Sequence, residues 1–389
     1  MLIALVGKSN TGKSTFFKAA TLVDVEISNR IFTTIKPNEG VAYITADCPC
    51  KELGKPCNPK NSKCENGTRL IPVKLLDVAG LVPGAHEGRG LGNQFLDDLR
   101  PAQVFIHILD ISGTTDDDGN PAEGHDPEKD IKFFEEELDY WYTSIFRREW
   151  SQMAKQTEIT HADFEKQILG RFSGLGMTKE NIRDAIRNSN VDPTSPTKWT
   201  DDDVFSFAKN LRQSSKPIII AANKMDLPSG GENFSRLKCD LMVPCCADFE
   251  LALRIAAERG LVNYVPGSHD FEIVKELPEG QKKALEKISN FLDRYGSTGV
   301  QSCLNRAVFE FMNCIVVYPV EDETHWSDKK GSVLPDAHLV PRGTTARQLA
   351  YEIHSDIGDK FIGALDARTK RKIGADHELK SGDIIKILT

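Results

Sequence analysis

Short apolar runs, each followed by a polar or glycine-rich turn, mark the first half of the chain. They lie at Leu2–Val6, Leu70–Leu76, Val104–Leu109 and Pro217–Ala222. Runs of this length bounded by turns are typical of strands, and strands that are apolar almost throughout are typical of a parallel sheet covered on both faces. A helix is expected at Lys13–Ala20, directly after the first strand and its glycine loop. The pattern predicts an α/β fold with a mostly parallel sheet.

The hydrophobic period changes between Asp110 and Lys216. Apolar side chains there recur three and four positions apart, as on one face of a helix: Ile131, Phe134, Leu138, Trp141 and Ile145. Further helices are expected at Ala162–Arg171, Lys179–Asn188 and Asp201–Arg212. We therefore predict a helical insertion at 111–215, within an α/β domain formed by 1–110 and 216–312. Inside the insertion, 113–124 is expected to be a mobile loop.

The last part of the chain alternates strand-like and turn-like pieces. Strands are expected at Cys314–Tyr318 and Ile384–Leu388, with a helix at Thr345–His354 between them. This mixture predicts a separate small domain at 313–389.

Composition places the chain among globular proteins. Its 389 residues are 40% hydrophobic and 27% charged, and the length is enough for two or three domains. The opening apolar run is far shorter than the roughly 20 residues that span a bilayer, so no membrane association is expected. The formal net charge of −8 excludes a global basic field, so any RNA contact must be local.

The loop after the first strand matches the Walker A pattern. Its glycines let backbone N–H groups wrap phosphates, Lys13 would reach the β- and γ-phosphates, and Ser14 would hold Mg²⁺. The alternative is an ordinary glycine turn. The residues expected to contact nucleotide here are Gly7, Lys8, Ser9, Asn10, Thr11, Gly12, Lys13, Ser14 and Thr15.

A second motif closes the strand at 70–76. Asp77 stands where a P-loop fold places an aspartate in the Mg²⁺ shell, and Gly80 stands where a backbone N–H contacts the γ-phosphate. The motif is short, and its position after the strand is what makes it persuasive.

Two further motifs would read the base. Asn223, Lys224 and Asp226 follow the strand at 217–222, and an aspartate there accepts two N–H groups of guanine that adenine does not offer. After the next apolar stretch, a guanine-contacting loop is expected at Cys246, Ala247 and Asp248. A turn at a strand end is the alternative for the first motif.

Taken in order, these motifs resemble the Obg-related GTPases, and most closely the YchF-type branch that ends in a TGS domain. Residues 32–41 resemble that family's first switch and 77–85 its second, while 339–345 and 378–383 resemble a TGS domain of β-grasp fold. The resemblance implies that Thr34 closes on Mg²⁺. It also implies a ribosome or other RNA–protein partner, contacted through the helical insertion and the TGS domain.

The resemblance also bears on hydrolysis. Leu81 stands where Ras-like proteins carry a water-orienting glutamine, so slow intrinsic turnover of GTP to GDP is expected. Asn10 matches the P-loop asparagine of potassium-activated GTPases, which implies a K⁺ near the phosphates. Catalytic roles are accordingly expected for Lys13, Thr34, Gly80 and Asn10. YchF relatives often bind ATP, and Asp226 departs from them towards GTP.

Four of the nine cysteines fall between the first switch and Leu70: Cys48, Cys50, Cys57 and Cys64. Four thiolates suit a tetrahedral zinc ion, although their spacing is irregular, and reduced loop thiols are the alternative. Either interpretation favours a reducing, cytoplasmic compartment over a disulfide framework. For the whole chain, the alternatives to a GTP-driven switch are an ATPase or kinase of the same fold and a non-hydrolysing RNA-binding scaffold.

Overall fold

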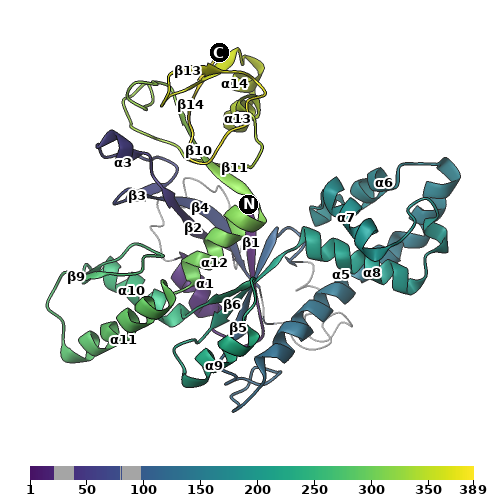
Figure 1. Cartoon of the computed structure of the whole chain (residues 1–389), viewed down its shortest axis with the longest axis horizontal. Helices are drawn as coiled ribbons and strands as arrows, with labels where there is room; N and C mark the ends of the chain where they lie inside the picture. Colours follow the sequence, from purple (N-terminus) through teal and green to yellow (C-terminus); the bar gives the residue numbers. More distant parts are fainter. Residues whose placement is uncertain (22–38, 79, 81–97) are drawn as a thin grey trace.

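A computed structural model describes residues 1–21, 39–78, 80 and 98–389 (Figure 1). Its large sheet has the strand order β2-β4-β1-β5-β6-β7, with β3 paired to β4. The strands from β4 to β7 in that order are parallel, whereas β2 and β3 run antiparallel to β4. The strands are β1 (Leu2–Val6), β2 (Glu39–Asp47), β3 (Lys63–Glu65), β4 (Thr68–Asp77), β5 (Val104–Asp110), β6 (Ile218–Asn223) and β7 (Met242–Pro244). The predicted mostly parallel sheet is confirmed.

Both faces of this sheet are buried, and β1 shows how. Ile3 and Leu5 belong to the apolar cluster that contains Phe16 of helix α1 (Lys13–Thr21). The alternate residues Ala4 and Val6 belong to a second cluster on the opposite face, because successive side chains of a strand point to opposite sides. Helices therefore cover both faces, which is why the strands are apolar almost throughout.

Four α-helices lie between β5 and β6 and extend to one side of the sheet (Figure 1). They are α5 (Pro127–Thr160), α6 (Phe164–Arg171), α7 (Lys179–Ser189) and α8 (Asp201–Ser215). Phe134, Leu138 and Trp141 of the predicted stripe are buried in their shared core. Side-chain caps begin the helices; for example, Thr178 and Thr200 each form a capping box with the residue three positions on.

The described residues hold further helices, one between β2 and β3 and the others after β6. They are α3 (Cys50–Leu53), α9 (Pro228–Leu237), α10 (Ala247–Glu258), α11 (Glu279–Tyr295) and α12 (Val300–Arg306), with a π-helical turn at Ala307–Phe311 and a small pair of strands, β8 (Val262–Asn263) and β9 (Glu272–Ile273). None of the helices in the described part of the chain is both long and apolar enough to cross a membrane.

The C-terminal sheet has five strands in the order β11-β10-β14-β12-β13. Its central pair, β10 and β14, is parallel, and the other pairs are antiparallel, which gives the predicted β-grasp arrangement. Thr345 and His354 cap the two ends of the predicted helix. The elements are β10 (Cys314–Val320), β11 (His338–Pro341), α13 (Ala346–Ile353), α14 (Ser355–Asp359), β12 (Gly363–Asp366), β13 (Arg371–Ile373) and β14 (Ile384–Leu388).

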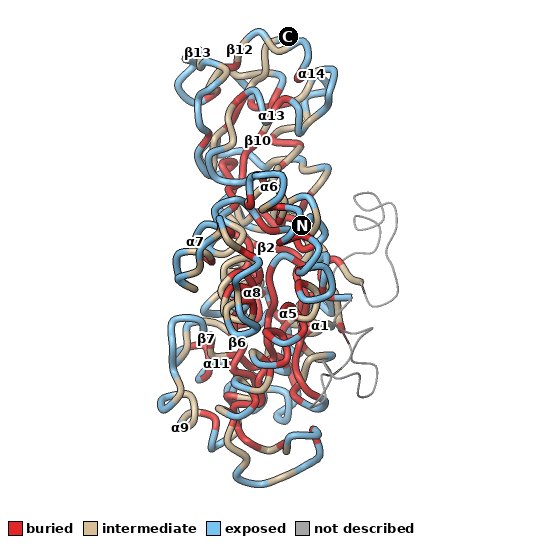
Figure 2. The backbone as a smooth tube through the Cα atoms, turned by 90° about the vertical axis from the view of Figure 1, so that its right-hand side faces the viewer, coloured by how far each residue is buried: buried red, intermediate tan, exposed pale blue. Residues whose placement is uncertain are grey.

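One apolar cluster connects the two sheets. It extends from Ile3 and Phe16 through Cys48 and Cys50 to Tyr318 of β10. Figure 2 shows buried backbone continuing from the large sheet into the C-terminal part. The C-terminal sheet is therefore packed against the segment that contains the cysteines.

Candidate nucleotide site

The glycine loop between β1 and α1 is held tightly against its neighbours. Gly7 and Gly12 have φ angles of 146° and 93°, which side chains rarely adopt. A Cβ on Gly7 would lie 2.6 Å from the carbonyl oxygen of Ile108, and a Cβ on Gly12 would lie 2.3 Å from Nδ2 of Asn223. Glycine is therefore required at both positions for the loop to approach β5 and β6.

Lys13 and Asp77 form an ion pair beside this loop. The Nζ of Lys13 lies 2.5 Å from Oδ1 of Asp77, and both side chains are mostly shielded from solvent. Asp77 is opposite Leu5 in the parallel pairing of β1 and β4, so the carboxyl ends of these strands meet here. Gly80 lies in the same place, because a Cβ on it would be 2.9 Å from Oγ of Ser9. Ser14, at the start of α1, is exposed, and Thr15 is partly buried.

Asn223 connects the glycine loop to the second base-reading loop. Its Nδ2 donates to the carbonyl of Thr11 at 2.8 Å, and its Oδ1 accepts from the backbone N–H of Ala247 at 3.0 Å. Both bonds are buried. This one side chain therefore links the glycine loop to the start of α10.

Asp226 and Cys246 also meet. The Sγ of Cys246 donates to Oδ1 of Asp226 at 3.1 Å, while Asp226 itself is exposed. Burial, followed by the charge of Asp226, raises the pKa of the Cys246 thiol, so it remains a donor at neutral pH. Asp248 is exposed in the first turn of α10. The exposed carboxylate of Asp226, after the end of β6, can therefore accept hydrogen bonds from the N–H groups of a ligand.

Lys224 leads to a residue that the sequence analysis missed. With a φ of 65°, Lys224 directs its Nζ to Oδ2 of Asp110 at 2.8 Å. Asp110 is completely buried, and its oxygens also accept from the hydroxyls of Ser112, Thr114 and Thr115. Burial opposes ionisation, but the hydrogen bond from Lys224, followed by that from Ser112, lowers the pKa of Asp110 overall. The sequence did hold a signal for this role: Asp110 ends an apolar strand and is followed within five positions by three residues with hydroxyl groups.

Residues 113–124, expected to be a mobile loop, are instead joined to the glycine loop by hydrogen bonds. Lys8 donates through Nζ to the carbonyl of Thr115 at 2.9 Å, and Asn10 donates through Nδ2 to that of Gly119 at 2.9 Å. Thr115 and Pro121 form a bridge that closes the segment into a hairpin. We call 113–124 the insertion hairpin. The amide nitrogen of Asn10 is engaged here, and its role towards K⁺ stays a prediction.

Parts of the predicted site lie outside the described residues. Thr34 and most of the first switch are among them, as are Leu81 and the rest of the second switch. Glu39 and Gly40, placed in the first switch by sequence, begin strand β2.

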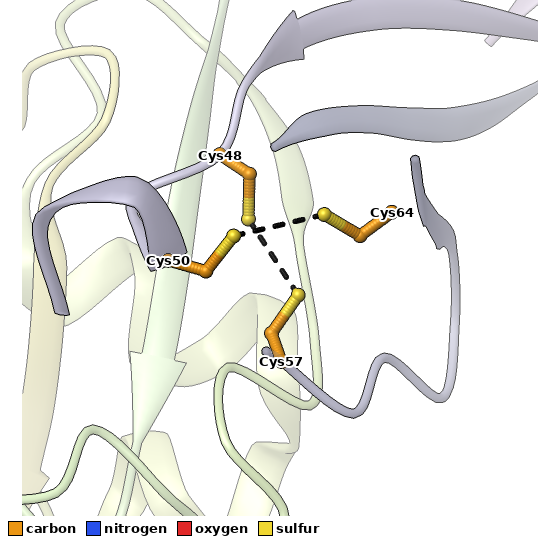
Figure 3. Close-up of side chains that lie close together, drawn as sticks. All are labelled: Cys48, Cys50, Cys57 and Cys64. Carbon is orange, nitrogen blue, oxygen red and sulfur yellow. Dashed lines mark hydrogen bonds between the residues drawn. The ribbon is translucent and has the colours of Figure 1, made fainter. Parts of the chain in front are cut away.

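The four cysteines gather at the other end of β4 from Asp77. Cys48 follows β2, Cys50 begins α3, Cys57 lies in the next loop and Cys64 is in β3. Their sulfurs all lie within 4.8 Å of one another, and Figure 3 shows the four side chains pointing towards one centre.

Comparison with known families covers most of the chain. The family described as 50S ribosome-binding GTPase matches residues 2–140, and the TGS domain matches 329–389. Between them, residues 221–322 match the family described as Obg-like GTPase YGR210-like, G4 motif-containing domain.

Individual relatives extend over the full length. A GTP-binding protein of Methanocaldococcus jannaschii, called uncharacterised, is 51% identical, and the match covers 100% of this chain and 99% of that protein. The ribosome-binding ATPase YchF of Bacillus subtilis is 28% identical, and the match covers 98% of this chain and 97% of that protein. The chain belongs to the YchF-like branch of the Obg-related GTPases. The crystal structure of a GTP-binding protein from Pyrococcus horikoshii is similar to this chain with a TM-score of 0.81, at 40% identity over 100% of both chains. The chain is thus a GTP-binding protein that carries a C-terminal TGS domain.

Proposed function

We propose that this YchF-like protein hydrolyses GTP to GDP and phosphate and acts as a nucleotide-dependent switch. The observation that carries the proposal is the position of Asn223. It bonds the glycine loop and the N-terminus of α10 together, and it leaves the exposed carboxylate of Asp226 at the end of β6. In this proposal the glycine loop binds the phosphates and Asp226 accepts hydrogen bonds from the N–H groups of guanine. The two bonds of Asn223 hold these two parts of the site together.

Phosphate and magnesium chemistry fits the other half of the site. Ser14 and Asp77 offer a hydroxyl and a carboxylate, the hard oxygen ligands that Mg²⁺ prefers, and Thr34 is the proposed third ligand. Mg²⁺ would neutralise charge that develops on the phosphate oxygens. Lys13, which is paired with Asp77 in this structure, would bind the β- and γ-phosphates. The backbone N–H of Gly80 would donate a hydrogen bond to the γ-phosphate when GTP is bound.

Slow intrinsic turnover is part of the proposal, because Leu81 offers no side chain to orient the attacking water. We propose that K⁺, held with the help of Asn10, supplies some of the missing positive charge. Replacing K⁺ with Na⁺ at equal ionic strength should slow turnover, and equal rates in both salts would remove this element alone.

The proposed partner is a ribosome or another RNA–protein complex in the cytoplasm. Support comes from the Bacillus subtilis relative, which is called a ribosome-binding ATPase, and from the presence of a TGS domain. That name also favours the second candidate, an ATPase, since the relative is called an ATPase. Pelleting with ribosomes in GTP analogue, GDP and no nucleotide tests the partner; binding that ignores nucleotide would contradict the switch.

Nucleotide competition is the decisive experiment. A fluorescent guanine nucleotide is displaced by GTP, GDP or ATP in Mg²⁺ and K⁺, for wild type, Asp226→Asn and the control Asp248→Asn. We expect a strong guanine preference that Asp226→Asn removes and Asp248→Asn keeps. Equal or tighter ATP binding by the wild type would instead assign the chain to the ATPases.

A further inference from the structure

The segment between β2 and β4 folds without an apolar core of its own. From Cys48 to Gly67 the only aliphatic side chain larger than proline is Leu53, and that residue is partly exposed. So few apolar groups cannot offset the conformational entropy of ordering twenty residues, and small units of this kind are usually held by disulfides or a metal ion. All nine cysteines of the chain are free thiols in this structure.

The sulfur positions match a tetrahedron. Cys48 and Cys57 have their Sγ atoms 3.8 Å apart, and Cys50 and Cys64 have theirs 3.7 Å apart. Sulfurs bound about 2.3 Å from a tetrahedral zinc ion lie about 3.8 Å from one another. A disulfide would need about 2.05 Å, close to half the observed separation. The geometry therefore fits four separate ligands around one centre.

Arg69 supplies an independent observation. It lies in β4 directly opposite Cys64 and is completely buried, with no ion pair to a carboxylate in the described part of the chain. Its Nη2 donates to the carbonyl of Leu334, while Nε and Nη1 are buried without a hydrogen-bond partner among the described residues. The guanidinium also lies over the ring of Tyr318, 5.3 Å from its centroid, but burying a charge without a counter-charge is costly. Zinc bound by four thiolates carries a net charge of −2 and would provide it.

We propose that Cys48, Cys50, Cys57 and Cys64 bind one structural zinc ion, and that this site holds the surface on which the C-terminal sheet docks. Four protein ligands close the coordination shell, which is the arrangement of structural rather than catalytic zinc. The site lies at the opposite end of β4 from the nucleotide loop, so it is separate from the proposed GTP chemistry.

The docking surface lies between the third and fourth ligands. Asn58 and Lys60 donate their backbone N–H groups to the carbonyls of Val333 and Pro335, at 2.8 and 2.7 Å. Asn61 completes the contact with two bonds to the backbone of Ala337. A zinc ion that fixes both ends of 57–64 keeps these donors in line with the chain entering β11.

A salt bridge extends the same interface. Glu52, in α3 after the second ligand, binds the guanidinium of Arg368 through two bonds of 2.7 Å. Nearby, the hydroxyl of Tyr318 donates to the carbonyl of Asp47, one residue before the first ligand. Contacts on both sides of the cysteines therefore depend on how this segment is held.

The first test is metal content. The untagged full-length protein, purified under reducing conditions, is analysed for zinc and iron by mass spectrometry, beside Cys57→Ser/Cys64→Ser and the control Cys239→Ser, whose thiol is exposed and distant in sequence. We expect one zinc per chain in wild type and control, and loss of zinc in the double variant. Absence of stoichiometric zinc, iron in its place, or disulfides between these cysteines would overturn the proposal.

The second test uses the wild-type protein alone, so a variant that does not fold cannot obscure the result. Zinc is removed with a chelator and restored, and amide hydrogen exchange is followed at 58–61 and 333–337. We expect removal to speed exchange in both segments by about tenfold or more and restoration to reverse it. Unchanged exchange with the metal removed would refute the docking role, whatever the metal content.

Discussion

The ammonium group of Lys8 lies 2.7 Å from Oδ2 of Asp130, and both side chains are almost fully buried. Lys8 belongs to the glycine loop and Asp130 to the first turn of α5, so a single ion pair joins the nucleotide loop to the helices at 127–215. The other oxygen of Asp130 is 2.9 Å from Nε2 of His125. The helical part of the molecule is therefore coupled to the nucleotide site by charge as well as by packing.

Removing either partner of this pair should be costly. Lys8→Met or Asp130→Asn leaves a buried polar group without its counter-charge, so we expect each to lower the free energy of unfolding by about 3–5 kcal/mol. The double variant should lose about 1–3 kcal/mol less than the sum. Urea unfolding followed by tryptophan fluorescence measures this, because Trp141 and Trp150 lie in the core around α5.

Lys132→Met is the matched control for that cycle. Its partner Glu128 is on the same helix, and both side chains are well exposed, so the change should leave the free energy of unfolding almost unaltered. Additive costs for Lys8 and Asp130 would show that the two residues do not act as a pair.

The insertion hairpin can be tested with two glycines. Gly119 and Gly124 have φ angles of 82° and 72°, so alanine strains the backbone at both. A Cβ on Gly119 would lie 2.6 Å from the carbonyl oxygen of Ser9, whereas nothing lies within 4 Å of one on Gly124. We expect Gly119→Ala to weaken GTP binding by about tenfold or more through displacement of the glycine loop, and Gly124→Ala to change it little. Equal affinities, by the competition measurement, would mean that the hairpin does not position the loop.

Asn223 should contribute to both stability and affinity. Asn223→Ala leaves the buried carbonyl of Thr11 and N–H of Ala247 unpaired, at a cost of about 2–4 kcal/mol in unfolding free energy. GTP affinity should fall by about tenfold or more, since two binding loops lose their connection. Asn233→Ala is the comparison, because that side chain donates a single bond, to Ile111, and its loss should leave affinity unchanged. Similar affinity losses in both variants would refute the connecting role.

Lys216 gives a prediction for pH. Burial, followed by the charge of Arg100, lowers the pKa of Lys216 to about 8, against about 10.4 in an unfolded chain. Between these values the unfolded state binds more protons, so stability rises with pH in that interval. Relative to Lys216→Met, the wild type should gain about 1–3 kcal/mol from pH 8 to pH 10. Unfolding by urea at several pH values measures the difference; a flat difference would place the pKa of the buried lysine at its ordinary value.

Local chemistry made some of this site predictable. Lys13 and Asp77 were found because a glycine loop after a strand, and an aspartate ending a neighbouring strand, are patterns confined to a few residues. The strand β2 was missed even though Val41 to Thr45 are mostly apolar or β-branched; its first residues were assigned to the switch at 32–41, and the rest were given no element. Its pairing with β4 is what brings Cys48 near Cys64.

Contacts between distant residues could not be predicted in the same way. Lys8 and Asp130 are separated by more than a hundred positions, and nothing in the period of α5 indicates which face meets the glycine loop. The same holds for Arg69, whose burial depends on Leu334 and Tyr318 from the end of the chain. Charge alone would place an arginine in β4 at the surface.

Strand β4 has one end at Asp77, beside the glycine loop, and the other near Arg69, beneath the C-terminal sheet. The eight steps between these residues cover about 26 Å. Hydrogen-bonded neighbours on both sides hold the strand along its length, so one continuous strand connects the proposed nucleotide site with the C-terminal sheet. If the proposed γ-phosphate contact displaces Asp77, the same strand would carry that displacement towards the contacts of the C-terminal sheet.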